Sequence, residues 1–581
     1  MFVKAIKLVQ KNHRLWLFFI MLTLSGAAAI DLSIHFTGLS RHPHIEKELY
    51  RYFQLEKDVM EHIKPTDINT LGDFYIHQVE RVMQYYGYFN SKVTTNLQDL
   101  NEDHYRLVVN IIPQYQMTVD QIVMEVIGES ELKVDDLMTS LAMKEGDVFQ
   151  VPVYESDKNE LLRYLDNHGY VRSDLEQTMV FVEPSVNQAK VRYVVRLGRR
   201  FRFGDIKIND NKLDQKFIKA FAPMTIETGA VYSGELLDSW YSHLAGSPYF
   251  KNITIEPDLL NMNEETNQID IHVQVQNDKF MRSVIGVGYD TLDFFYANYL
   301  MQLQPLTKYG HLLSWLVRYN QNRKLHSELV YTIPSINNPV NQRSDIRAFL
   351  LPSVDYVGGT YEQKKFEFNQ YQSMGDLSLS LALGMTDEYY NHFAGPRYHT
   401  VYPYIRGHFL HDRWLPNYVH WLKKRIIIDV ETSLQSKNNF QKVFMDLGNR
   451  IDYDYFSIEN NFKLGRIFSS DNQNLALSNY FSLGSSNGLR GYGTHAIGPG
   501  LKVWSNQLEL QKSIGGNDTY IYGFFDVGQI SNKINLSDSL QSFGLGFLYR
   551  SQLEFDVKFD IAHPVGGRGI KVNFSVEKVF G

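Results

Sequence analysis

The chain has 581 residues, of which 44% are hydrophobic and 14% aromatic, so it is too apolar to be disordered and long enough for several domains. The formal net charge is −7, and no run of Lys and Arg follows the N-terminal segment, so we expect no nucleic-acid partner. Because the sequence contains no cysteine, disulfides, Cys-ligated zinc and thiol catalysis are excluded.

The first 29 residues have the pattern of an export signal. Four basic residues precede an apolar run at 15–24, and the small residues Ala27 to Ala29 follow it. The alternative is a membrane anchor, but crossing a bilayer takes about 20 apolar residues and this run is shorter. We therefore predict that residues 1–29 are a signal peptide, cleaved after Ala29.

A repeated unit follows the signal. Segments 81–97, 161–175 and 240–259 each read as an amphipathic helix, a Gly or Ser-Pro break, a tyrosine with an apolar neighbour, and then a strand. The three tyrosines recur at similar spacings, 82 residues (88 to 170) and 79 residues (170 to 249).

Two further features agree with this repeat. The sequence around Gly146 is repeated around Gly229, and each unit ends in an alternating strand, at 105–112, 189–197 and 268–276. The pattern predicts three α+β domains with the order strand, helix, helix, strand, strand, at 30–113, 114–197 and 198–277. Three unrelated α+β domains are the alternative.

From residue 278 to 581 the hydrophobic period changes to two. Segments of about ten residues alternate between apolar and polar and then break at Gly, Asn, Asp or Pro, for example at 311–320, 376–384, 424–435 and 503–511. After an export signal, this pattern is typical of a transmembrane β-barrel, since only a closed sheet leaves no unpaired edge in lipid. A soluble β-sandwich would also alternate.

We expect sixteen antiparallel strands in the barrel. Eleven precede a glycine-rich loop at about 470–500 and five follow it, provided that residues 475–484 belong to the loop. In the segment 554–561 one face is apolar and is expected to face lipid, and the other is charged and is expected to face the lumen (Glu554, Asp556, Lys558 and Asp560).

The glycine-rich loop contains one arginine, Arg490. If the loop enters the lumen, this cation must exchange water for acceptors on the inner wall. Asp526 is the preferred partner, with Asp560 and Glu509 as second choices, and Glu554 and Asp556 also lie on the lumen face. Gly491 and Gly493 would let the loop approach the wall closely. An ordinary surface arginine is the alternative.

These features together resemble the BamA/TamA outer-membrane insertase superfamily. The repeat resembles the POTRA domain, LRGY at 489–492 is similar to the [VIL]RG[FY] motif, and YGFFDVG at 522–528 is similar to the F-x-D-x-G motif. The resemblance spans the chain after the signal, so the expected fold is tandem α+β POTRA domains followed by a 16-stranded antiparallel transmembrane β-barrel. It implies that Arg490, Gly491 and Tyr492 lock the loop inside the lumen.

The resemblance also implies a lateral gate between the first and last strands. Glycines weaken strand pairing, and they occur in the first strand (Gly286 and Gly288) and just before the last (Gly566, Gly567 and Gly569). Phe574, Val576 and Phe580 would form a C-terminal strand signal.

The implied function is the folding, insertion or secretion of β-barrel and autotransporter clients in the outer membrane of a Gram-negative bacterium, with the domains in the periplasm. Three repeats favour the TamA branch, the translocation and assembly module, whose partner is a TamB-like inner-membrane-anchored periplasmic protein bound through the first POTRA domain. Unfolded outer-membrane proteins and outer-membrane lipid are the other expected partners. A two-partner secretion transporter, a passive pore and an envelope lipid-transport component are the alternatives.

We expect no enzyme activity, catalytic residue, cofactor or metal. The match of residues 484–488 to G-x-S-x-G lacks the strand and helix that a nucleophile elbow needs, and the sequence has no H-E-x-x-H and no P-loop. A barrel lipase would need a Ser/His pair that the sequence does not identify.

Overall fold

The computed structural model divides the chain into two compact units. One contains the residues up to Asp205 with Glu227–Glu235 and Asp258–Asp270, and the other contains Ile206–Ile226, Leu236–Pro257 and the chain from Ile271 onward. The predicted signal peptide lies outside the described residues, which are 31–60, 68–101, 104–128, 131–209, 211–290, 294–320, 324–356, 359–392, 395–414, 422–435, 439–453, 456–470, 475–485, 487–493, 496–514, 519–531, 538–550, 555–567 and 569–580.

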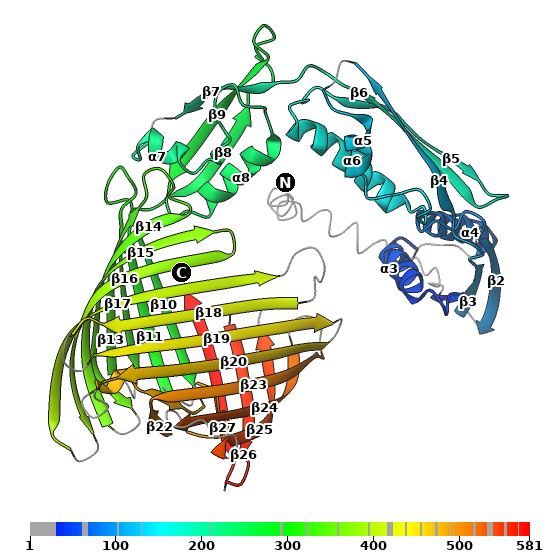
Figure 1. Cartoon of the computed structure of the whole chain (residues 1–581). Coiled ribbons are helices and arrows are strands. Elements are labelled where there is room, and N and C mark those ends of the chain that lie inside the picture. Colours follow the sequence, from blue (N-terminus) through cyan, green and yellow to red (C-terminus); the bar gives the residue numbers. More distant parts are fainter. Residues whose placement is uncertain are drawn as a thin grey trace, which may run out of the picture. The chain divides into compact units, whose positions relative to one another are not determined.

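Three α+β domains precede the barrel, each in the predicted order of strand, helix, helix, strand, strand (Figure 1). The first contains β1 (Asp31–Thr37), α3 (Pro43–Met60), α4 (Ile68–Tyr85), β2 (Lys92–Asn101) and β3 (His104–Ile112). The second contains β4 (Thr118–Ile127), α5 (Val134–Ser140), α6 (Val151–Asn167), β5 (Asp174–Glu183) and β6 (Gln188–Arg196). The third contains β7 (Arg202–Ile208), α7 (Gln215–Lys219), α8 (Gly234–Ala245), β8 (Phe250–Pro257) and β9 (Gln268–Asn277).

The three sheets share one topology, in which the last strand lies in the centre: β1-β3-β2, β4-β6-β5 and β7-β9-β8. In the first two domains the opening strand is parallel to the central strand and the remaining strand is antiparallel to it. The common order and topology agree with the repeat seen in the sequence.

Each domain has a core between its helices and one face of its sheet. In the first domain Tyr75, Val79 and Met83 are spaced by one helical turn on α4 and are fully buried, together with Val109 of β3. The amphipathic period of the helix and the alternation of the strand therefore meet in one cluster.

The repeated glycines have two different roles. Gly87 and Gly169, just before the repeated tyrosines, have φ of +89° and +88°, and a Cβ on them would lie 2.3 Å from the carbonyl oxygen of Phe149 and 2.6 Å from that of Phe201. These neighbours belong to the following domain or its linker, so the glycines permit close docking of consecutive domains. Gly146 also has a positive φ, +91°, but a Cβ on it would have no atom within 4 Å.

The second part of the chain is a closed antiparallel barrel of sixteen strands (Figure 1). Eleven strands precede the long loop: β10 (Met281–Asp290), β11 (Phe294–Leu303), β12 (Leu312–Asn320), β13 (Lys324–Pro334), β14 (Gln342–Tyr356), β15 (Gly359–Met374), β16 (Leu377–His392), β17 (Arg397–Trp414), β18 (Leu422–Ser433), β19 (Phe440–Tyr453) and β20 (Phe456–Ser469). Five follow it: β23 (Lys502–Ser513), β24 (Thr519–Ser531), β25 (Leu540–Arg550), β26 (Phe555–Pro564) and β27 (Lys571–Phe580). The predicted strand count and its division are confirmed.

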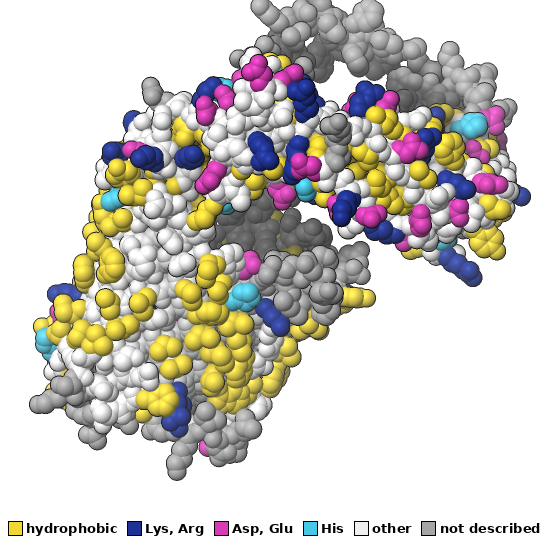
Figure 2. Space-filling view, turned by 45° about the horizontal axis from the view of Figure 1, so that its top comes forward, with side chains coloured by type: hydrophobic (Ala, Val, Ile, Leu, Met, Phe, Trp, Pro, Cys, Tyr) yellow, Lys and Arg dark blue, Asp and Glu magenta, His cyan; other side chains and the backbone are white. Residues whose placement is uncertain are grey.

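The barrel wall is apolar outside. On β16, Leu381, Leu383 and Met385 are 55%, 51% and 52% exposed, whereas Ala382 and Glu388 on the other face are 1% and 0% exposed. Figure 2 shows hydrophobic side chains gathered over the visible barrel wall, while charged side chains of both signs gather over the α+β domains. No helix in the described ranges is long and apolar enough to cross a membrane.

The third domain contacts the turn between β11 and β12. Burial raises the pKa of the Tyr249 hydroxyl, which stays protonated and donates a 2.5 Å hydrogen bond to the carbonyl oxygen of Gly310. The amide of Asp214 donates to the carbonyl oxygen of Lys308 at 2.9 Å. Both contacts lie within the second compact unit and hold residues 214 and 249 against this turn.

Candidate functional site

The loop between β20 and β23 folds back into the barrel, and we call the described residues within 470–501 the re-entrant loop. It contains a 3-10 turn, η2 (Leu477–Asn479), and two short antiparallel strands, β21 (Phe481–Leu483) and β22 (Ile497–Gly500). Leu477, Leu483 and Leu489 are at most 1% exposed and share one hydrophobic cluster with wall residues such as Tyr404 and Val503. Residues 475–484 are therefore part of the loop, as predicted.

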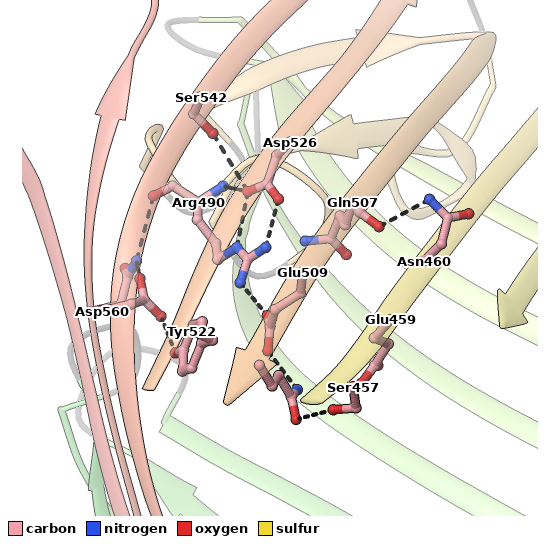
Figure 3. Close-up of polar contacts among 12 residues, drawn as sticks. Ser457, Glu459, Asn460, Arg490, Gln507, Glu509, Tyr522, Asp526, Ser542 and Asp560 are labelled. Atoms are coloured by element: carbon pink, nitrogen blue, oxygen red, sulfur yellow. Dashed lines mark hydrogen bonds and ion pairs between the residues drawn. The ribbon is translucent and has the colours of Figure 1, made fainter. Parts of the chain in front are cut away.

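Arg490 lies at the tip of this loop and bonds the wall through its side chain and its backbone (Figure 3). Its Nε and Nη2 donate to the two oxygens of Asp526 at 3.0 and 2.7 Å, and its Nη1 donates to Glu509 at 2.7 Å. The backbone amide of Arg490 also donates to Asp526, at 3.0 Å. We call these contacts the first anchor.

Strand geometry explains why these groups meet. Glu509 on β23 and Asp526 on β24 point inward because residues of one parity face the lumen. Phe524 lies on the same face of β24, and the guanidinium carbon of Arg490 is 3.5 Å from the centre of its ring. The cation thus has carboxylates at its edge and an aromatic ring against its plane.

Arg490 and its two carboxylate partners are largely buried. The side chains of Arg490, Glu509 and Asp526 are 9%, 14% and 0% exposed. A buried charge is tolerated only when it is paired and hydrogen-bonded, so the loop tip and the wall depend on each other.

Neighbouring polar side chains extend the first anchor to the last strands. Ser542 on β25 accepts from the amide of Gly491 at 3.2 Å, and Asn573 on β27 donates to the carbonyl oxygen of Arg490 at 3.4 Å. Asn573 also donates to Asp560 at 2.7 Å. The tip therefore lies against β23 to β27, with hydrogen bonds to β23, β24, β25 and β27.

Asp526 is the partner preferred from the sequence, and the structure also brings Glu509 to Arg490. Asp560 does not bond the guanidinium, because Asn573 and Tyr522 occupy its oxygens at 2.7 and 3.3 Å. Glu554 lies outside the described residues.

The two tip glycines differ. A Cβ on Gly491 would lie 2.6 Å from the Cβ of Ser542 and 3.0 Å from the backbone nitrogen of Pro564, so only glycine fits there. Among the described residues, a Cβ on Gly493 would meet only the Cβ of Ala496, at 3.6 Å. The expectation that Gly493 also permits a close approach to the wall is wrong, because no described atom of the wall lies within 4 Å of that position.

The sequence did not identify Phe524, Ser542 and Asn573 as parts of the anchor. Phe524 could have been found, since it shares the parity of Asp526. Ser542 and Asn573 carry no motif, and their role depends on the relative register of the last strands.

The barrel closes where β10 meets β27, and we call this junction the seam. Ile285–Asp290 pair with Ser575–Phe580 over six residue pairs, whereas β10 pairs with β11 over ten and β26 with β27 over eight. Among the described residues, Met281–Val284 have backbone partners only on β11. In the described part of the barrel, β10 therefore extends beyond the seam pairs.

The predicted gate glycines fall in two places. Gly286 and Gly288 lie in the seam, opposite Val579 and Glu577. A Cβ on Gly288 would lie 2.4 Å from the ring of Tyr296, so this glycine also makes room for a side chain of β11.

Gly566, Gly567 and Gly569 lie in the turn between β26 and β27, beyond the seam pairs, and Gly566 and Gly569 have positive φ. Phe574, Val576 and Phe580 all belong to β27, and the backbone of Val576 and Phe580 pairs across the seam.

Comparisons with known proteins agree with this geometry. The family "POTRA: Surface antigen variable number repeat" matches residues 118–198. The chain contains a POTRA domain. A search of curated proteins gave no match.

The structure is similar to BamA from Haemophilus ducreyi lacking POTRA domains 1–3, with a TM-score of 0.62 and 15% identity, over 79% of this chain and 99% of that one. CdiB from Acinetobacter baumannii also matches, with a TM-score of 0.48 and 14% identity, over 80% and 91% of the two chains. CdiB from Escherichia coli matches with a TM-score of 0.47 and 12% identity, over 89% and 99%. The fold is therefore a BamA-like combination of POTRA domains with a 16-stranded barrel.

The hydrogen bonds and ion pairs of this site anchor the loop to the barrel wall. In the part of the chain that the structure describes, no group of three or more His, Asp and Glu side chains is placed to hold a metal ion. Beside Arg490 lies a cavity of about 290 Å³, lined by Glu509, Lys558 and Asp560 among others. The lumen thus combines a fixed loop with a small polar space.

Proposed function

We propose that this protein is an outer-membrane assembly factor that helps β-barrel clients fold and insert through the seam between β10 and β27. The observation that carries the proposal is the short seam, with six residue pairs in a wall whose other described junctions have eight or more. The apolar outer wall supports an outer-membrane location, with the POTRA domains in the periplasm. The proposed role requires no catalytic residue.

The chemistry of strand edges supports the role of the seam. Unpaired backbone N–H and C=O groups on a strand edge bind another strand readily. Among the described residues, Met281–Val284 of β10 have backbone partners only on β11 and present such an edge. An incoming client hairpin could extend β10 there without first breaking a seam pair.

The test is reconstitution of the full-length protein in phospholipid vesicles with a chemically unfolded β-barrel client. We expect the folded, heat-modifiable client to form faster than in protein-free vesicles. Equal rates would refute the proposal. Client chains that appear inside the vesicles without inserting would indicate a secretion transporter, and lipid exchange without client folding would indicate a lipid-transport role.

We also propose that the protein acts as a TamA-like subunit with a TamB-like inner-membrane-anchored periplasmic partner. Three POTRA-type domains before the barrel support this, and the first of them, β1 to β3, would bind the partner. Co-purification with such a partner from envelope extracts should occur with the whole chain and be lost when residues 31–112 are deleted. Partner binding that survives the deletion would contradict this assignment.

A further inference from the structure

A second group of contacts holds the re-entrant loop at a different part of the wall. Ser478 of η2 donates from its backbone amide and its hydroxyl to the two oxygens of Glu388 on β16, at 3.1 and 2.5 Å. Gln363 on β15 donates to the same carboxylate at 2.8 Å and to the Ser478 hydroxyl at 2.9 Å. One carboxylate thus caps the turn.

The flanking loop residues are held as well. Asn479 and the Tyr402 hydroxyl on β17 exchange hydrogen bonds at 3.1 and 3.3 Å. The Tyr356 hydroxyl on β14 donates to the carbonyl oxygen of Tyr480 at 2.6 Å. Four consecutive wall strands, β14 to β17, therefore contact residues 478–480.

The carboxylate of Glu388 depends on the loop for its hydrogen bonds. Glu388 is 0% exposed, and its hydrogen-bond donors among the described residues are Gln363 and Ser478. A buried carboxylate needs several donors, and Ser478 supplies two of them. Like the first anchor, this contact is costly to break from either side.

We infer that Glu388, Gln363 and Tyr402 form a second anchor of the re-entrant loop, independent of Arg490. Three strands, β18 to β20, separate the second anchor from β23, where the first begins. Because Asn573 links the first anchor to β27, the loop connects a seam strand with the β14 to β17 wall. The tip can then leave Asp526 while residues 477–480 stay in place. This inference does not rest on the proposed function.

Thiol protection tests this independence in the full-length protein, which has no native cysteine. Ala476→Cys reports on the second anchor and Leu489→Cys on the first, since the native residues are 3% and 0% exposed. Each reporter is treated with a bulky, water-soluble maleimide. We expect Glu388→Ala to speed modification of the cysteine at 476 by about tenfold to a hundredfold, with little change at 489. We expect Arg490→Ala to speed modification at 489 by a similar factor, with little change at 476.

Glu367→Ala is the matched control. Glu367 is 1% exposed on β15, the neighbouring strand, and bonds Tyr404 and Arg406 rather than the loop. Glu367→Ala should leave the maleimide modification of both cysteines as slow as in the parent protein. Ser478→Ala changes the loop but not the barrel wall, and it should also speed modification at 476, by less than Glu388→Ala does. This variant replaces Glu388→Ala in the test if Glu388→Ala fails to fold.

Two results would overturn the inference. Glu388→Ala and Ser478→Ala could both leave the thiol at 476 as protected as in the parent. Alternatively, Arg490→Ala could speed modification of both thiols equally, which would mean that the whole loop depends on the first anchor alone.

Discussion

Arg490 is held by a bidentate ion pair whose partner is fully buried, so its loss should affect the wall as well as the loop. Arg490→Ala leaves Asp526 without its cation, and breaking a buried pair in this way costs about 3–5 kcal/mol. Asp526→Ala should cost a similar amount, and the double variant should be no worse than either single one. Strictly additive losses in thermal unfolding would show that the two residues act separately.

Arg490→Lys separates charge from geometry. Lysine keeps the cation but cannot donate to Asp526 through two parallel N–H groups or lie flat on Phe524. We expect a partial loss of heat-modifiable compactness, between the parent and Arg490→Ala. A variant as stable as the parent would indicate that charge alone holds the tip.

Gly491 and Gly493 provide a matched pair of substitutions two residues apart. Gly491→Ala should displace the tip, because its new methyl group meets Ser542 and the backbone of Pro564. Gly493→Ala should be nearly neutral. Maleimide reactivity of the Leu489→Cys reporter checks both, and equal reactivity in the two variants would contradict the close packing at Gly491.

The first anchor shows which residues a sequence can reveal. Asp526 was predictable because strand parity puts it on the lumen face and because it lies in a recognisable motif. Asn573 and Glu388 were not, because their roles arise from strands far apart in sequence. In the sequence, Glu388 cannot be distinguished from other inward-facing carboxylates, because its role depends on hydrogen bonds from the folded re-entrant loop.

Among the structural elements, the repeated glycines allow the effect of backbone strain within a domain to be measured separately from the effect on docking between domains. Gly87 and Gly146 have almost the same φ, so alanine strains the backbone similarly at both, by about 1–2 kcal/mol. Only at Gly87 would the new Cβ collide with the next domain. Gly87→Ala should therefore loosen the junction between the first two domains, whereas Gly146→Ala should not.

Limited proteolysis measures this difference. In the Gly87→Ala variant the linker at 113–117, whose Met117 amide donates to the carbonyl oxygen of Gly87 at 2.9 Å, should be cut faster than in Gly146→Ala. Equal cutting of the two variants would mean that strain at the turn, and not the domain contact, decides linker protection.

The strands of the barrel and the order of elements in the domains followed from the sequence because both are local. Alternation fixes which face of a strand meets lipid, and Gly, Asn and Pro mark where strands end. The short β21–β22 pair was not predicted, since its glycine-rich sequence has no strand period and its partners form only inside the lumen. The short seam likewise depends on how the closed sheet is staggered.

The proposed function of the whole molecule requires the seam between β10 and β27 to open. Val287 and Lys578 are paired in register across it, and Val287 is on the outer face with 47% exposure. A disulfide between Val287→Cys and Lys578→Cys would close the seam without disturbing the lumen. The matched control is Leu545→Cys with Ile561→Cys, an outward pair between β25 and β26.

The deciding measurement is the rate of client insertion into vesicles by these two variants, each oxidised and then reduced. We expect oxidation to stop insertion by the seam variant and reduction to restore it, whereas the control variant should work equally well in both states. Normal insertion by the oxidised seam variant would show that the seam does not have to open.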